Sequence, residues 1–178
     1  VVIPAYNDAE TLDKVIPHIL KQKYDADVEV IVVDDHSTDN TVEVARKYGV
    51  KIISHERNMG LAKSINDGVR ESRYDIVCVI EDDRLLADEE WFKKLVPYLI
   101  LYDDVICVTS PYILPREVYN KFGFWERAFF AWEMRKKFED RVVAVEYSDG
   151  SNTIWKKDLL LKVGGHDENF RVSGEDVD

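Results

Sequence analysis

The chain has 178 residues, of which 46% are hydrophobic and 33% are charged, a balance that is ordinary for one soluble globular domain. Its formal net charge of -11, from 24 Lys and Arg against 35 Asp and Glu, argues against nonspecific nucleic-acid binding, which needs a basic surface. No stretch approaches the roughly 18 consecutive apolar residues of a membrane span, and no secretory signal pattern opens the chain.

Apolar runs alternate with amphipathic stretches along the first 110 residues. We expect strands at residues 1–3, 28–33, 51–53, 76–80 and 105–108, and helices at 10–22, 41–48, 61–72 and 89–101. This alternation predicts a doubly wound α/β fold. The chain opens as if in the middle of a strand and stops just after an acidic cluster. We therefore expect it to be cut at both ends from a longer protein, whose flanks would carry any membrane segment.

Three acidic residues, Glu81-Asp82-Asp83, directly follow the apolar run 76–80. Such a run of apolar and β-branched residues is typical of a strand buried on both faces. Open α/β sheets bind ligands beyond the C-terminal ends of these strands. Because adjacent carboxylates repel each other, a hard divalent cation stabilises them. The triplet therefore predicts a metal-assisted site for a phosphorylated ligand.

Polar segments also follow the first two strands. The segment Pro4-Ala5-Tyr6-Asn7-Asp8 has backbone groups and an aromatic ring that suit a planar ligand, although an ordinary loop is the alternative. After the second strand, Asp35 is expected to accept a hydrogen bond from a base or a ribose hydroxyl. Asp39 is expected to build the turn into the next helix.

Three glycine-bearing segments follow along the chain. Gly60 stands at the entrance of the helix 61–72, where backbone amides can approach a phosphate. In the same region, Lys63 is expected to be a solvated helix lysine and His55 a surface residue. Glycines beside acidic residues at 164–168 and 174–178 suggest loops that deliver carboxylates to a site, with solvated acidic loops as the alternative.

The ordered set of motifs resembles that of inverting glycosyltransferases of family 2, which have the GT-A fold, over essentially the whole chain. The segments that carry the resemblance are Ile3-Pro4-Ala5-Tyr6-Asn7, Val33-Asp34-Asp35-His36-Ser37-Thr38-Asp39, Asn58-Met59-Gly60, Glu81-Asp82-Asp83, Gly164-Gly165-His166-Asp167-Glu168 and Gly174-Glu175-Asp176. The resemblance implies a Rossmann-like, three-layer α/β/α fold with a mixed, mostly parallel sheet. It also implies a single domain over 1–178, with a nucleotide-sugar-binding half at 1–110 and an acceptor-side half at 111–178.

For the nucleotide, the resemblance implies five positions. Pro4, Ala5 and Tyr6 would line the pocket for the base and the ribose. Asp8 would lie near that pocket, and Asp35 would hydrogen-bond the base.

For the chemistry, the resemblance implies a DxD-type element and a separate base. Asp83 would bind Mg²⁺ or Mn²⁺, and Asp82 would face the ribose or the donor sugar. Glu81 stands where the family usually has Asp, which puts a direct metal contact at that position in doubt. Asp176 would be the catalytic base, with Glu175 beside it on the acceptor side.

The implied activity is inverting transfer of a sugar from a nucleotide-diphosphate sugar, with UDP-sugars favoured, to a glycan, a lipid or another hydroxyl acceptor. The implied location is the cytoplasm, and a membrane anchor in the full-length parent would place the domain at the cytoplasmic face. A sugar nucleotidyltransferase, a phospho-receiver module and a donor-binding but inactive fragment remain as alternatives. The first usually has a basic, glycine-rich loop after its first strand, whereas residues 5–10 of this chain are acidic.

Overall fold

The computed structural model describes residues 1–81, 86, 88–109 and 152–169. The chain divides into two compact units, one formed by Val1–Thr109 with Gly150–Asp178 and the other by Ser110–Asp149. All described residues belong to the first unit, so the fold below is the fold of that unit. The second unit lies outside the described residues.

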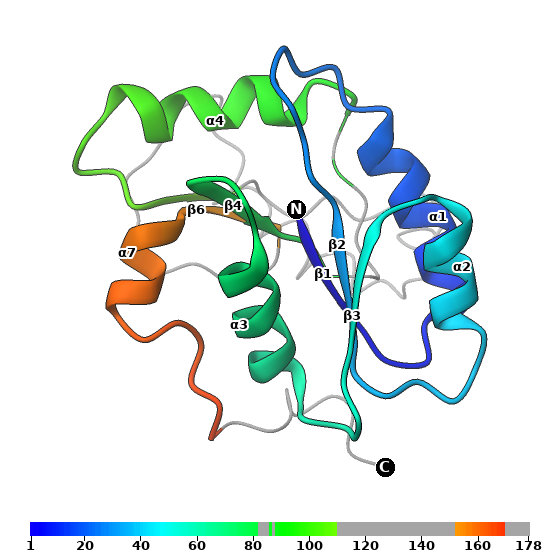
Figure 1. Ribbon diagram of the computed structural model, residues 1–178. Helices are drawn as coiled ribbons and strands as arrows, with labels where there is room; N and C mark the ends of the chain where they lie inside the picture. Colours follow the sequence, from blue (N-terminus) through cyan, green and yellow to red (C-terminus); the bar gives the residue numbers. More distant parts are fainter. Residues whose placement is uncertain (82–85, 87, 110–151, 170–178) are drawn as a thin grey trace, which may run out of the picture. The chain divides into compact units, whose positions relative to one another are not determined.

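Six strands of the described residues form one sheet in the order β3-β2-β1-β4-β6-β5 (Figure 1). Neighbours among β1 to β4 run parallel, whereas β6 is antiparallel to both β4 and β5. The strands are β1 (Val2–Ala5), β2 (Ile31–Asp34), β3 (Lys51–Ser54), β4 (Ile76–Val79), β5 (Cys107–Thr109) and β6 (Thr153–Lys156). β1 and β2 are rich in β-branched residues and buried throughout, as expected for parallel strands covered on both faces.

Helices α1 (Ala9–Leu20), α2 (Thr41–Lys47) and α4 (Trp91–Leu101) cover one face of the sheet. α1 buries Leu12, Val15, Ile16 and Ile19, whose spacing of three and four residues places them on one stripe. Pro17 lies inside α1 and has no N–H for the Asp13 carbonyl, four residues earlier. The hydroxyl of Tyr48 contacts both that carbonyl oxygen, at 3.1 Å, and the Asp13 carboxylate, which joins α1 to the end of α2.

Helices α3 (Leu61–Glu71) and α7 (Lys157–Lys162) pack on the opposite face (Figure 1). Ile65 and Val69 of α3 pack with Val2 and Val33 of the sheet. Gly68 permits this close approach, because a Cβ there would stand 2.3 Å from Val2 Cγ1 and 2.9 Å from Val33 Cγ2. α3 therefore rests directly on β1 and β2.

The predicted α/β fold with a mostly parallel sheet and helices on both faces is confirmed. The strand expected at 28–33 begins only at Ile31, because Val28 is 41% exposed and lies ahead of the β1 ladder. β6 and α7 are additions that the sequence pattern did not indicate. No helix of the described residues is long and apolar enough to cross a membrane.

Candidate functional site

The C-terminal edge of the parallel strands brings the first group of predicted residues together. β1 ends at Ala5 and lies between β2 and β4, so the direction of the strand crossovers changes beside it. Ligands of open α/β sheets bind at such a switch point. Pro4 and Ala5 are buried within β1, while Tyr6 projects beyond it with 47% of its surface exposed. The Tyr6 ring is therefore available to a ligand at this edge.

The turns that follow β1 and β2 are hydrogen-bonded to each other. Asn7 N–H donates to Ser37 Oγ at 2.9 Å, and Thr38 N–H donates to Asn7 Oδ1 at 2.8 Å. Asn7 has a left-handed φ of 56°, which asparagine tolerates better than most residues. Because these hydrogen bonds join the two turns, they fix the positions of Tyr6 and Asp35 relative to each other.

Asp8 and Asp39 organise the starts of α1 and α2. Asp8 N–H donates to Thr41 Oγ1 at 2.9 Å, and the Asp8 carboxylate accepts from Tyr6 N–H at 3.0 Å. Asp39 accepts from the N–H groups of Ala9 and Thr41. Burial raises the pKa of Asp39, but its hydrogen bonds to Thr41 and Ala9 outweigh that effect and hold the pKa below its ordinary value. The expectation that Asp39 builds the turn is confirmed.

Asp35 is 4% exposed, and its carboxylate is held by the segment that enters α3. Oδ1 accepts from Met59 N–H at 2.7 Å, and Oδ2 accepts from Gly60 N–H at 2.8 Å. Gly60 has φ 91°, a left-handed conformation that favours glycine. This role of Asp35 in fixing the backbone was not expected from the sequence. Its contact with a base stays a prediction.

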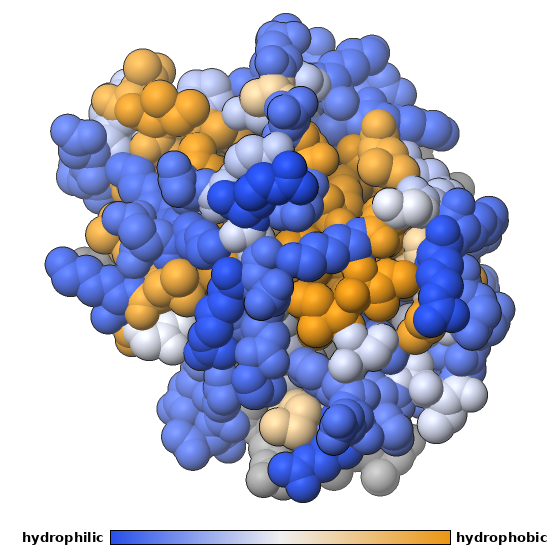
Figure 2. Space-filling view, in the orientation of Figure 1, coloured by the Kyte–Doolittle hydropathy of each residue, from blue (hydrophilic) through white to orange (hydrophobic). Residues whose placement is uncertain are grey.

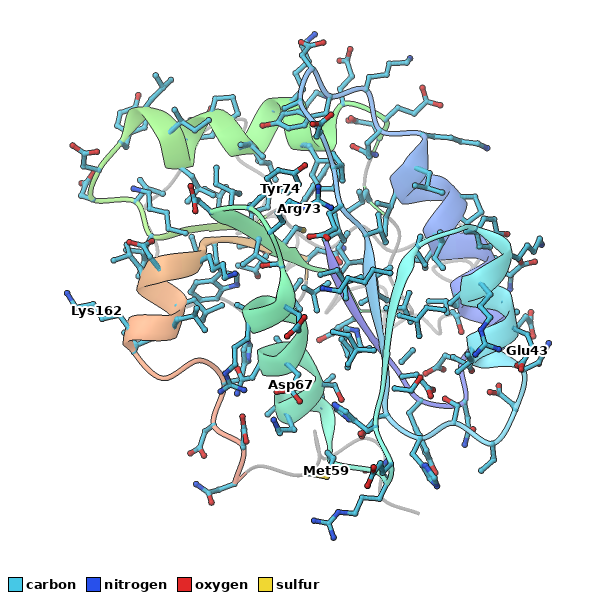
Figure 3. All side chains as sticks on the ribbon, in the orientation of Figure 1. Glu43, Met59, Asp67, Arg73, Tyr74 and Lys162 are labelled. Carbon is cyan, nitrogen blue, oxygen red and sulfur yellow. The ribbon has the colours of Figure 1, made fainter. Side chains whose placement is uncertain are left out.

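His55 is not a surface residue, and this expectation was wrong. Its side chain is 9% exposed and stands between two carboxylates, with Nδ1 2.7 Å from Asp35 Oδ1 and Nε2 3.2 Å from Asp67 Oδ2. Lys63 is not simply solvated either, because its ammonium contacts Asp67. Burial raises the pKa of Asp67, but the contacts with Lys63, His55 and Arg70 outweigh it and lower the pKa. Figure 3 labels Asp67 on α3 and Met59 in the segment before that helix.

Asn66 of α3 joins the helix to the segment after α7. Its side chain is 1% exposed, and its amide donates to His166 O at 2.8 Å and accepts from His166 N–H at 2.8 Å. The same amide donates to Glu168 Oε1 at 2.9 Å. A Cβ at Gly165 would lie 2.4 Å from Asn66 Oδ1, so this position needs glycine. The glycine-rich motif 164–168 is thus hydrogen-bonded to α3 through Asn66.

Several predicted residues lie outside the described residues, namely Asp82, Asp83, Glu175 and Asp176. Glu81 is described and half-buried, directly after the residue that extends β4 beside β1. Within the described ranges, no group of three His, Cys, Asp or Glu side chains is placed to hold a metal ion. The metal and catalytic roles therefore stay predictions.

A cavity of about 450 Å³ lies at the N-terminal ends of the parallel strands, whereas the candidate site lies at their C-terminal ends. Its lining includes Val1, Val28, Glu29 and Tyr74, which precede β1, β2 and β4. Tyr74 is labelled in Figure 3, and Figure 2 shows apolar side chains exposed on this face of the protein. The cavity is remote from Tyr6 and Asp35, which follow the other ends of these strands.

The chain is similar to curated proteins that are named as sugar transferases. A glucosyl-dolichyl phosphate glucuronosyltransferase of Haloferax volcanii is 26% identical over 173 residues, covering 93% of this chain and 54% of that protein. A dolichol-phosphate mannosyltransferase of Pyrococcus furiosus is 32% identical over 124 residues, covering 67% of this chain and 35% of that protein. The chain thus spans about half or less of the length of these relatives.

Solved structures share the fold. A mannosyltransferase of Pyrobaculum calidifontis, in complex with GDP-Man and Mn²⁺, matches with a TM-score of 0.68 and 22% identity, covering 94% of this chain and 47% of that chain. Residues 1–349 of S. aureus TarS, in complex with UDP, match with a TM-score of 0.69 and 18% identity, covering 97% and 51%. The model of the family described as Glycosyl transferase family 2 matches residues 1–156. The chain therefore belongs to glycosyl transferase family 2.

Proposed function

We propose that this protein transfers a sugar from a nucleotide-diphosphate sugar to an acceptor hydroxyl, with inversion at the anomeric carbon. The proposal rests on the polar residues that gather at the C-terminal ends of β1, β2 and β4, in a chain that belongs to this family. Tyr6, Asp35 and Glu81 follow these three strands at the switch point of the sheet. An aromatic ring and a buried carboxylate suit a nucleoside there, and further carboxylates suit the metal of a diphosphate.

The nucleoside would bind on the paired turns after β1 and β2. Pro4 and Ala5 would form the wall of the pocket, and the exposed Tyr6 ring would contact the base or the ribose. Asp8 shapes the same turn through its hydrogen bond to Tyr6 N–H. Asp35 would accept a hydrogen bond from the base. The hydrogen bonds that hold these turns prepare the pocket before a ligand enters.

The residues around the end of β4 fit Mg²⁺ or Mn²⁺. Glu81 stands at the C-terminal end of β4, and Asp82 and Asp83 follow it directly in the sequence. Carboxylate oxygens are the donors that these hard cations prefer. Asp83 would hold the ion, and Asp82 would face the ribose or the donor sugar. Such an ion stabilises the negative charge that develops on a departing diphosphate.

Asp176 would supply the base, with Glu175 beside it on the acceptor side. Asp176 would take the proton of the acceptor hydroxyl as its oxygen attacks the anomeric carbon. One base is enough, because the nucleoside diphosphate leaves without a covalent enzyme intermediate.

Structures of three related proteins support a UDP- or GDP-sugar as the donor. TarS has been solved with UDP and with UDP-GlcNAc, and the Pyrobaculum enzyme with GDP-Man and Mn²⁺. Glucosyl-3-phosphoglycerate synthase of Mycobacterium tuberculosis has been solved with Mn²⁺ and UDP. We propose a UDP-sugar for this chain, with a glycan, a lipid or another hydroxyl compound as the acceptor.

A thermal-shift panel of UDP, GDP, CDP and dTDP, each with and without Mn²⁺, tests the proposal. We expect metal-dependent stabilisation by UDP above the other nucleotides. No metal-dependent shift with any nucleotide would contradict the proposal. A product assay separates the closest alternative, because sugar transfer releases a nucleoside diphosphate and nucleotidyl transfer releases pyrophosphate.

A further inference from the structure

His55 stands between two acidic side chains and has little access to solvent. Its side chain is 9% exposed, Nδ1 lies 2.7 Å from Asp35 Oδ1, and Nε2 lies 3.2 Å from Asp67 Oδ2. Both ring nitrogens therefore lie within hydrogen-bond distance of a carboxylate oxygen, so the imidazole is held from both sides.

The acceptor positions of Asp35 are nearly filled by its own chain. A carboxylate has about four lone-pair positions. Oδ1 contacts both His55 Nδ1 and Met59 N–H, and Oδ2 accepts from Gly60 N–H. These contacts leave one acceptor position on Oδ2, counted over the described residues. A single N–H donor of a ligand matches that position.

Asp67 holds the imidazole from the other side. It lies on α3, and Lys63 and Arg70 from the same helix contact its Oδ1. Because both contacts are made to Oδ1, the other oxygen, Oδ2, is available to His55 Nε2. The orientation of the imidazole is therefore tied to the helix that packs on β1 and β2.

We propose that His55 is a positioning residue for the donor base, acting through Asp35. It fixes the plane of the Asp35 carboxylate so that the remaining position on Oδ2 meets an imino N–H of the base. Uracil and guanine carry such an N–H, and cytosine does not. The inference rests on the proposed function, because it takes Asp35 as the contact for the base.

Two substitutions separate this role from a merely structural one. In His55→Asn, the side-chain amide nitrogen takes roughly the place of Nδ1, so the contact with Asp35 is kept. In His55→Gln, the amide nitrogen takes roughly the place of Nε2, so only the contact with Asp67 is kept. The affinities for UDP with Mn²⁺ and for inorganic pyrophosphate with Mn²⁺ are measured by calorimetry, alongside the midpoint of thermal unfolding.

We expect His55→Asn to keep UDP affinity within about threefold, and His55→Gln to lose about tenfold or more, since the misoriented Asp35 carboxylate then loses its charge-assisted hydrogen bond to the base. Pyrophosphate has no base, so its affinity should be unchanged in both variants.

Asp67→Asn retains His55 and Asp35 and should weaken UDP binding by less than His55→Gln does. It also tests the inference should His55→Gln fail to fold. Glu43→Gln is the control, because it removes a carboxylate from an exposed ion pair on α2.

Equal losses of UDP affinity in His55→Asn and His55→Gln would overturn the inference. A parallel loss of pyrophosphate affinity would also overturn it, because the effect would then not pass through the base. Failure of the unaltered protein to bind either UDP or GDP with Mn²⁺ would instead overturn the proposed function on which the inference rests.

Discussion

At the scale of single residues, Gly68 sets how closely α3 approaches the sheet. A methyl group there would overlap Val2 Cγ1 at 2.3 Å and Val33 Cγ2 at 2.9 Å, and both valines are fully buried. Overpacking costs about 1–3 kcal/mol, while alanine regains up to about 1 kcal/mol of helix propensity. We expect Gly68→Ala to lower the free energy of unfolding by about 1–2 kcal/mol, measured by urea denaturation.

The paired variant Gly68→Ala with Val2→Ala checks the cause. Removing the Val2 methyl groups makes room for the new methyl group, so the double variant should lose less stability than the sum of the two single losses. Strictly additive losses would show that the overlap with Val2 is not the reason.

Asp67 links local electrostatics to the stability of the fold. Burial raises its pKa, but Lys63, His55 and Arg70 lower it further, so the pKa in the folded protein lies below its unfolded value. A depressed carboxyl pKa adds stability above the unfolded pKa of about 3.9, and this stability is lost as the pH falls through the folded value. We expect Asp67→Asn to be less stable at pH 7 by about 1 kcal/mol or less, because the pairs are partly solvated.

Denaturation of both proteins from pH 7 to pH 3 checks this prediction. The difference in unfolding free energy should shrink as the pH falls below the unfolded pKa of about 3.9, because uptake of a proton then favours the unfolded chain. A difference that stays constant with pH would point to packing rather than charge.

At the scale of elements, α3 and the segment 164–169 form one hydrogen-bonded piece. Asn66 both donates to and accepts from the His166 backbone, and its side chain is almost fully buried. Asn66→Ala would leave two backbone groups without these partners, at about 1–3 kcal/mol for a buried group. We expect the His166 amide to exchange its hydrogen about tenfold faster or more, measured by hydrogen exchange.

Asn66→Asp is the matched comparison for this prediction. Aspartate keeps an acceptor for His166 N–H, but it has no amide for His166 O, and its charge lies beside Glu168, to whose Oε1 the Asn66 amide donates at 2.9 Å. With Glu168→Gln in the same background to remove that repulsion, exchange at His166 should stay closer to that of the unaltered protein than in Asn66→Ala. Unchanged exchange in Asn66→Ala would show that the amide does not hold this segment.

Some strands and site residues can be predicted from the sequence, whereas others depend on contacts that form only when the chain folds. The runs Ile31–Asp34 and Ile76–Val79 are predictable because apolar, β-branched residues stand together. β6 (Thr153–Lys156) is not, because its short sequence TIWK begins and ends with polar residues. His55 was placed wrongly because its partners, Asp35 and Asp67, lie 20 and 12 residues away in the sequence. Pairing of separate strands and helices, not local pattern, decides its burial.

At the scale of the whole molecule, donor binding and proton removal are assigned to different parts of the chain, so they should fail separately. Asp176→Asn should lower turnover by roughly 10²- to 10⁴-fold, the usual contribution of a general base, with Mn²⁺-dependent nucleotide affinity retained. Asp83→Ala should instead remove the Mn²⁺-dependent part of nucleotide binding, because it takes away the proposed ion ligand. Single-turnover rates and calorimetric titrations with and without Mn²⁺ measure the two effects. Loss of nucleotide affinity in Asp176→Asn would contradict its role as the base, and intact metal dependence in Asp83→Ala would contradict its role as the ligand.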